Sequence, residues 1–183
     1  MKTPQKALPR IPSATPSQHL DELGENKAAT GTAPPVIQMR KILVPIDFSE
    51  MSMKALRYAV AFARQFQAGI VLLHVVGPAT YPQQFSYIGF HETKRYDRAA
   101  KLLEELRKRE IPLDLPTETI VTMGIAFDAI VETAKKMDVD LIITTTHGHT
   151  GLKHVMIGST AERIASGAPC PVLVVRIQEH EFV

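Results

Sequence analysis

The residues best placed to do chemistry are the glycines and hydroxyls of residues 144–163, TTTHGHTGLKHVMIGSTAER. Gly148 and Gly158 bracket a nine-residue loop, and Ser159 and Thr160 follow the second glycine. A glycine-bracketed loop leaves backbone N–H groups accessible, and the helix expected after it adds partial positive charge at its start. Both features suit a phosphate group, so this segment is the first candidate binding site.

Two of the polar residues have an alternative role that needs no ligand. Ser159 and Glu162 form S-x-x-E, a capping box that would satisfy the start of the same helix. A cap and a phosphate can coexist, because a capping hydroxyl leaves other N–H groups unpaired. Asp47 follows an apolar run and could cap the next helix or shape its turn, or it could accept from two adjacent hydroxyls of a ribose. Both alternatives stay open for each residue.

Several other chemistries lack the residues that they need. His147, His149 and His154 have no cysteine nearby and no recognisable ligand spacing, so no dedicated metal site is predicted. His147 or His149 could contact phosphates instead, and Lys153 has the same option. The chain has no G-x-x-x-x-G-K-[ST] loop, and no G-x-G-x-x-G follows the first strand. P-loop phosphoryl transfer and dinucleotide binding are therefore not expected, and no catalytic residue is assigned.

The elements that must position these residues alternate regularly along the chain. Apolar runs predict strands at 41–47, 70–76, 117–123, 140–145 and 171–177, and helical patterns fill each interval between them. Gly69 is predicted to stop the first helix. Strict alternation with nearly continuous apolar strands predicts an α/β fold, a three-layer α/β/α sandwich with a five-stranded parallel sheet.

A doubly wound sheet of this kind, with order 3-2-1-4-5, places its ligands where the winding reverses between the first and fourth strands. The carboxyl ends of those strands carry Pro45, Ile46 and Asp47 on one side and Thr144 and Thr145 on the other. The glycine-bracketed loop follows the fourth strand directly. Asp47 and the loop are therefore expected to face one crevice.

Composition bounds the remaining possibilities. The 183 residues suffice for one well-buried domain, and a net charge of +2 gives no electrostatic footprint for nucleic acid. No apolar run is long enough to span a bilayer, and the opening residues lack the apolar core of a signal peptide, so a cytoplasmic location is expected.

Residues 1–39 contain six of the 13 prolines and predict a disordered tail before a domain at 40–183. The lone Cys170 is interpreted as a small buried filler.

The folded part resembles the universal stress protein (UspA-like) family. The resemblance covers about residues 40–176 and rests on KILVPIDFSE, LLHVV, DLIITTTHG, GSTAERI and APCPVLVV. It implies the Rossmann-like fold of the adenine-nucleotide alpha hydrolases and commonly a homodimer through the last strand, here 171–177. One branch of the family binds ATP through a pattern of Gly, two residues, Gly, nine residues, Gly, then Ser or Thr.

Transferred to this chain, the pattern has its second and third glycines at Gly148 and Gly158 and its hydroxyls at Ser159 and Thr160. The first glycine position holds Thr145, which places a β-carbon where the backbone would approach the nucleotide. The resemblance further implies a ribose contact at one acidic residue, adenine contacts at two apolar ones, and a glycine at the pocket border. The full expected set is Pro45, Ile46, Asp47, Val75, Gly124, Thr144, Thr145, His147, Gly148, Gly158, Ser159 and Thr160.

The sequence thus predicts a homodimeric stress-response protein that binds ATP or another adenine nucleotide, with Mg²⁺ or Mn²⁺ carried by the phosphates. Nucleic acid and membranes are not expected partners. Hydrolysis is expected to be slow at most, because no arginine finger or Walker-type magnesium ligand is recognisable. The alternative is a dimeric interaction scaffold that binds no nucleotide, its crevice closed by Thr145 and neighbouring side chains. A true hydrolase or transferase is a third possibility.

Overall fold

The structure, a computed structural model, describes residues 36–78, 88–146, 158–176, 180 and 183. Residues Ile37–Val183 belong to one compact unit. The predicted tail, 1–39, lies outside the described residues except for residues 36–39. In the part of the chain that is described, no helix is both long enough and apolar enough to cross a membrane.

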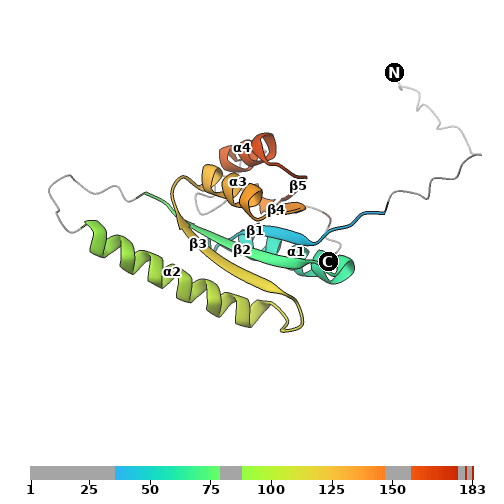
Figure 1. The fold of residues 1–183 in the computed structure, drawn as a ribbon, viewed down its shortest axis with the longest axis horizontal. Coiled ribbons are helices and arrows are strands. Elements are labelled where there is room, and N and C mark those ends of the chain that lie inside the picture. The colour runs from blue at the N-terminus through green and yellow to red at the C-terminus, as the bar shows by residue number, and fades with distance from the viewer. Residues whose placement is uncertain (1–35, 79–87, 147–157, 177–179, 181–182) are drawn as a thin grey trace, which may run out of the picture. The chain divides into compact units, whose positions relative to one another are not determined.

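Five strands form one parallel sheet in the order β3-β2-β1-β4-β5 (Figure 1). This confirms the predicted strand order. The predicted strand at 171–177 is shorter in the structure, and residue 177 lies outside the described residues. The strands are β1 (Lys41–Pro45), β2 (Gly69–Val76), β3 (Thr117–Met123), β4 (Leu141–Thr145) and β5 (Val172–Val175).

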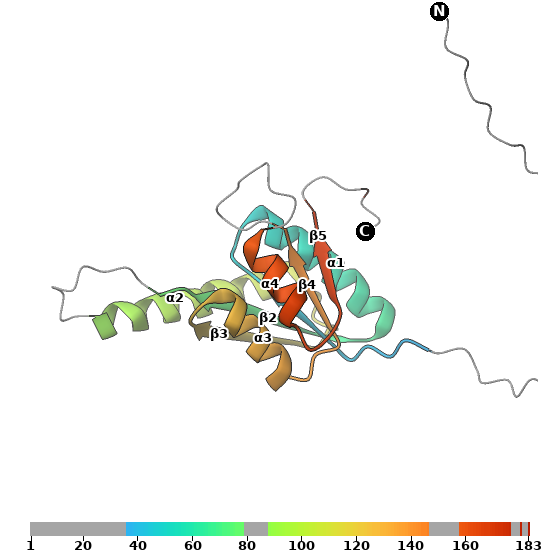
Figure 2. The same ribbon diagram turned by 90° about the horizontal axis from the view of Figure 1, so that it is seen from above.

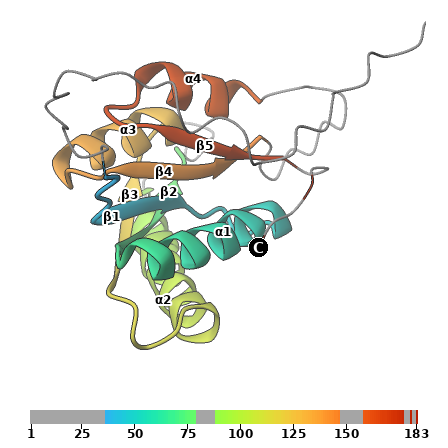
Figure 3. The ribbon, with the colours of Figure 1, turned by 90° about the vertical axis from the view of Figure 1, so that its right-hand side faces the viewer.

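Helices cover both faces of the sheet, as the three-layer prediction requires (Figure 3). On one face, α1 (Glu50–Phe66) lies against β1 and β4, and α2 (Ile88–Glu110) lies along β2 and β3 (Figure 2). On the other face lie α3 (Ala126–Lys136) and α4 (Ser159–Gly167), which contact each other. The predicted α/β/α sandwich is therefore confirmed.

The inner strands β1 and β2 are apolar at nearly every position because both of their faces are buried. Successive strand residues point to opposite faces, so Ile42 and Val44 pack toward α1 while Leu43 between them packs toward α3 and α4. All three side chains are fully buried. This two-sided burial explains why β1 and β2 show continuous apolar runs, whereas β3 at the edge of the sheet mixes polar and apolar residues.

The first helix ends differently from the prediction. α1 ends at Phe66, and Gln67 after it adopts a left-handed conformation with φ 55° while its N–H donates to the carbonyl of Ala63. Gly69 does not stop the helix but begins β2, and its N–H donates to the carbonyl of Arg40 at 2.8 Å. The prediction was wrong because a non-glycine residue takes the left-handed position that glycine usually fills.

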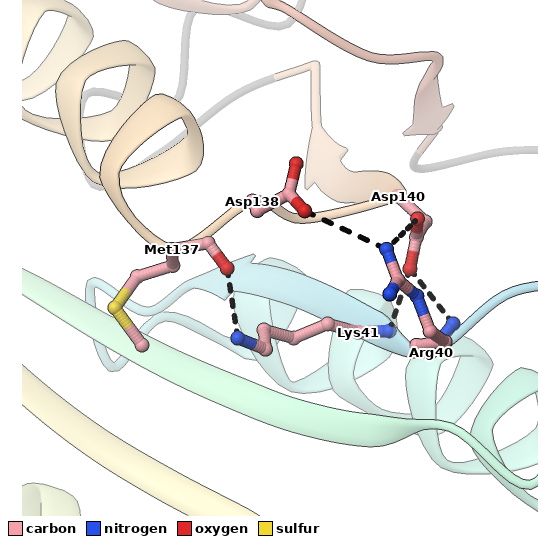
Figure 4. A network of polar contacts seen from close by, with 5 residues as sticks. All are labelled: Arg40, Lys41, Met137, Asp138 and Asp140. Carbon is pink, nitrogen blue, oxygen red and sulfur yellow. Dashed lines mark hydrogen bonds and ion pairs between the residues drawn. The ribbon is translucent and has the colours of Figure 1, made fainter.

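A polar network fixes the amino ends of β1 and β4 (Figure 4). One carboxylate oxygen of Asp140 accepts from the backbone N–H groups of Arg40 at 2.7 Å and Lys41 at 2.9 Å. The Arg40 guanidinium lies 4.0 Å from the other oxygen and 3.5 Å from Asp138, and the Lys41 ammonium donates to the carbonyl of Met137 at 2.7 Å. The start of β1 is thus held to the segment that leads into β4.

Candidate functional site

A pocket of about 440 Å³ opens at the carboxyl ends of β1 and β4, where the winding of the sheet reverses. Its volume lies within the range of about 300–1,000 Å³ that is common for small-molecule sites. Residues from β1, β2 and β4 form its floor, and residues from α3, α4 and the first turn of α1 complete its walls. The structure therefore has a pocket at the place where a doubly wound sheet binds its ligands.

Most residues expected at the site line this pocket. Gly124 does not: it joins β3 to α3 with φ 140°, a conformation that favours glycine, and its N–H donates to the carbonyl of Val76 at 3.1 Å. His147 and Gly148 lie outside the described residues. The expected residues that line the pocket are Pro45, Ile46, Asp47, Val75, Thr144, Thr145, Gly158, Ser159 and Thr160.

Sequence reasoning missed the residues that neighbouring elements add. The spacing of some of them could have indicated their place. Leu73 lies two positions before Val75 on the same strand, so both side chains share one face of the sheet, and Ala126 and Ile130 share one face of a helix at a spacing of four. Ser52, in the first turn of α1, belongs to no motif. The missed lining residues are Ser52, Leu73, Ala126, Ile130, Thr146, Ala161 and Ile164.

Asp47 is held in a tight turn between β1 and α1. One of its carboxylate oxygens accepts from the backbone N–H of Ser49 at 3.0 Å and from the Ser49 hydroxyl at 2.5 Å. Phe48 between them has φ 63°. The Ser49 hydroxyl in turn accepts from the N–H of Ser52 at 3.2 Å, so Ser49 is the cap of α1. Asp47 therefore shapes the turn but does not cap the helix, and its carboxylate borders the pocket.

Among the described residues, no side chain caps the start of α4. Gly158 occupies the N-cap position, and Ser159 is already the first helical residue. The capping-box prediction for Ser159 and Glu162 is therefore wrong, because a capping serine must precede the helix. The first N–H groups of a helix have no acceptor within it, and the residues that carry them here, Ser159, Thr160 and Ala161, all line the pocket. This end of α4 is suited to an anion.

The position of Gly158 depends on a close approach between two backbone segments. Its N–H donates to the carbonyl of Thr146 at 2.8 Å, and a β-carbon at Gly158 would lie 2.5 Å from that same oxygen. Thr146 also donates its own N–H to Val175 of β5 at 3.1 Å. The end of β4, the start of α4 and the end of β5 are thus connected at one point, which leaves no room for a side chain at Gly158.

Comparison with known proteins decides the family. The profile of the Universal stress protein family matches residues 39–176, which is nearly the whole described domain. The chain belongs to the universal stress protein family. The resemblance in the sequence is thereby confirmed.

Individual universal stress proteins agree with this assignment. Universal stress protein MJ0531 of Methanocaldococcus jannaschii is 32% identical over 145 residues, which cover 78% of this chain and 85% of that protein. The solved structure of MJ0577 from the same organism superimposes with a TM-score of 0.71 at 30% identity, over 79% of this chain and all of that one. A universal stress protein solved in complex with cAMP has a TM-score of 0.57 at 19% identity over 78% of this chain and 100% of that one, which shows the shared fold.

Thr145 is where this universal stress protein departs from the glycine pattern of the ATP-binding branch. Its side chain is partly buried and lines the pocket. The volume of about 440 Å³ is measured with that side chain in place. The described residues therefore leave a pocket beside Thr145.

Cys170 lies away from the pocket, packed against the apolar layer beneath α3 and α4. Partial burial and the nearby Asp140 carboxylate raise the pKa of its thiol, and the backbone N–H of Ile142 opposes this only in part. The thiol therefore stays protonated at neutral pH, which makes it a poor nucleophile.

Proposed function

We propose that this universal stress protein binds an adenine nucleotide, with ATP as its main ligand, and acts as a nucleotide-dependent regulatory protein in the cytoplasm. One observation carries the proposal: the pocket at the switch point brings together Asp47 and the start of α4, which no described side chain caps. A carboxylate can accept from the two hydroxyls of a ribose, and unpaired N–H groups at a helix start suit phosphates. The two groups complement different parts of one nucleotide.

Each part of the nucleotide has a proposed place. The adenine lies against the aliphatic side chains near Ile46 and Val75, and the ribose hydroxyls donate to Asp47. The phosphates accept from the N–H groups and hydroxyls of Ser159 and Thr160, with Mg²⁺ or Mn²⁺ carried by the phosphates. Gly158 contributes by its lack of a side chain, since its own N–H already donates to Thr146.

Binding without rapid turnover fits the lining of the pocket. None of the described lining residues is a lysine or an arginine, so these residues offer no cation to the charge that develops on a phosphoryl group during transfer. Asp47 is the one carboxylate among them and is the candidate for orienting a water molecule. Hydrolysis is accordingly proposed to be slow at most.

Titration calorimetry with MgATP tests the proposal. The unmodified protein is expected to bind ATP saturably below millimolar concentration. Asp47→Asn keeps an oxygen for Ser49 but removes the charge, so ATP binding is expected to weaken by about 10-fold to 100-fold, as for the loss of a hydrogen bond to a charged group.

The matched control is Asp114→Asn, an equal change of charge in the exposed turn that precedes β3 at the far edge of the sheet. Its affinity for ATP is expected to equal that of the unmodified protein. An equal effect of both substitutions would contradict the ribose assignment. No saturable binding up to millimolar ATP would refute the nucleotide function and favour the scaffold alternative.

The protein is further proposed to be a homodimer that pairs through β5. This strand lies at the edge of the sheet and is entirely apolar, and such an edge can add a strand from a second copy across a two-fold axis. Sedimentation velocity is expected to give a mass about twice the 20.2 kDa of the chain. Val174→Lys is expected to shift the protein to monomer, because a charged side chain opposes pairing at an edge.

Thr119→Lys provides the control, since it places the same charge on β3 at the opposite edge of the sheet. It is expected to leave the dimer intact. A monomeric unmodified protein, or equal dissociation by both substitutions, would contradict the proposed interface.

A further inference from the structure

Thr144 is a buried threonine in the floor of the pocket, with 7% of its surface exposed. It follows Ile142 by two positions on β4, so both side chains point toward α3 and α4. Ile142 packs with Ile130 of α3 and Ile164 of α4, and these two helical residues also line the pocket. The Thr144 hydroxyl therefore lies in an aliphatic part of the pocket.

No hydrogen bond joins this hydroxyl to another described residue, and it is not among the fully buried unpaired atoms of the described residues, so its oxygen is accessible from the pocket. A ligand that fills the pocket would cover the hydroxyl, and a covered hydroxyl without a partner is unfavourable by about 1–3 kcal/mol. Because the Thr144 side chain lines a pocket, the natural partner is a group of the molecule that fills the pocket. A threonine at this position thus points to a polar atom on the ligand.

The position of Thr144 along β4 indicates which part of a nucleotide it meets. The carbonyl of Thr146, two residues further on, contacts Gly158 at the start of α4, where phosphates are proposed to bind. Since a strand rises about 3.3 Å per residue, Thr144 lies roughly 7 Å deeper. At that depth the pocket is lined by aliphatic side chains such as Leu73 and Ile164, which suit a flat heterocycle and not a charged phosphate.

We propose that the Thr144 hydroxyl hydrogen-bonds to the heterocyclic base of the bound nucleotide and thereby selects which base the pocket accepts. The inference rests on the proposed nucleotide-binding function. A hydroxyl both donates and accepts, so it can pair with a ring nitrogen or an exocyclic group at one edge of the base. A base that lacks a matching group leaves the hydroxyl buried and unpaired, which is the arrangement that rejects an analogue most strongly.

Thr144→Val tests the inference because valine keeps the shape and removes the hydroxyl. Affinities for the Mg²⁺ complexes of ATP, GTP, CTP and UTP are measured by calorimetry. The variant is expected to lose about fivefold to tenfold in affinity for the preferred nucleotide, as for one neutral hydrogen bond, and less than about twofold for the other three. Thr144→Ser keeps the hydroxyl and is expected to retain the preference.

A second readout separates this role from a structural one. Without nucleotide, Thr144→Val is expected to change the melting temperature by less than about 2 °C, because the hydroxyl is accessible from the pocket and makes no bond that supports the fold. Affinity should therefore fall while stability stays nearly unchanged. A variant that is both less stable and weaker in binding would show that the hydroxyl supports the fold, which would overturn the inference.

The control is Thr122→Val on β3, an identical change on a strand that does not line the pocket. It is expected to leave all four affinities unchanged. Equal weakening of all four nucleotides by Thr144→Val would overturn the assignment to the base, and unchanged affinities would overturn any contact. If the unmodified protein binds no nucleotide, the proposed function and this inference both fail. If it binds a nucleotide and Thr144→Val leaves that affinity unchanged, only the inference is refuted.

Discussion

Replacing Gly158 with alanine is expected to lower the free energy of unfolding by about 2–4 kcal/mol. The added β-carbon would lie 2.5 Å from the carbonyl oxygen of Thr146, and both groups belong to the backbone, so no side chain can rotate to relieve the contact. The two segments must separate, which lengthens or breaks the 2.8 Å hydrogen bond from Gly158 to Thr146. Urea unfolding followed by circular dichroism measures the change.

Gly77→Ala is the matched control, because a β-carbon there would meet nothing within 4 Å and the backbone is not in the left-handed region. It is expected to change stability by less than about 0.5 kcal/mol. Under the proposed function, Gly158→Ala also moves the first turn of α4 and weakens ATP binding, while Gly77→Ala does neither. Equal stability of the two variants would show that Gly158 and Thr146 are not in close contact.

The fold was predictable because the signals that specify it are local. Ile42, Leu43 and Val44 are apolar in succession, which indicates a strand buried on both faces, and the structure buries all three. Because a helix separates each strand from the next, few topologies remain. The end of α1 was not predictable in the same way, because Gln67 takes a left-handed conformation that its residue type does not favour.

The approximate place of the pocket followed from the strand order, but its details depend on contacts between distant segments. The pattern of Ser159 and Glu162 predicts a capping box, yet the contact of Gly158 with Thr146 fixes where α4 begins and places Ser159 inside the helix. A local preference is overridden here by tertiary packing. In the same way, the capping role considered for Asp47 belongs to a serine two residues later.

The missed lining residues share one cause. Ala126 and Ile130 line the pocket because α3 packs over β2 and contacts α4, and the angle at which helices pack is not encoded in a short motif.

Thr144 was expected at the site from its place at the end of a strand. That its hydroxyl lacks a partner among the described residues depends on every neighbouring side chain, so only a structure could show it.

The second large effect is expected from Asp140, at the end of the sheet opposite the pocket. Asp140→Ala removes the acceptor of the N–H groups of Arg40 and Lys41 and is expected to lower the free energy of unfolding by about 2–3 kcal/mol. Asp140→Asn keeps an acceptor oxygen without the charge and should lose about 1 kcal/mol. Urea unfolding of both variants separates the loss of the hydrogen bonds from the loss of the charge.

Asp138→Asn is the control for charge in the same network (Figure 4). The Asp138 side chain is 91% exposed and lies 3.5 Å from the Arg40 guanidinium, whose side chain is 75% exposed, and an ion pair of such exposed groups stabilises little. Asparagine also tolerates its left-handed φ of 50°, so a change below about 0.5 kcal/mol is expected. If Asp140→Ala were no more destabilising than Asp138→Asn, the two backbone N–H groups would not depend on Asp140. Since the pocket is at the other end of β1 and β4, a folded Asp140→Ala protein should bind ATP as the unmodified protein does.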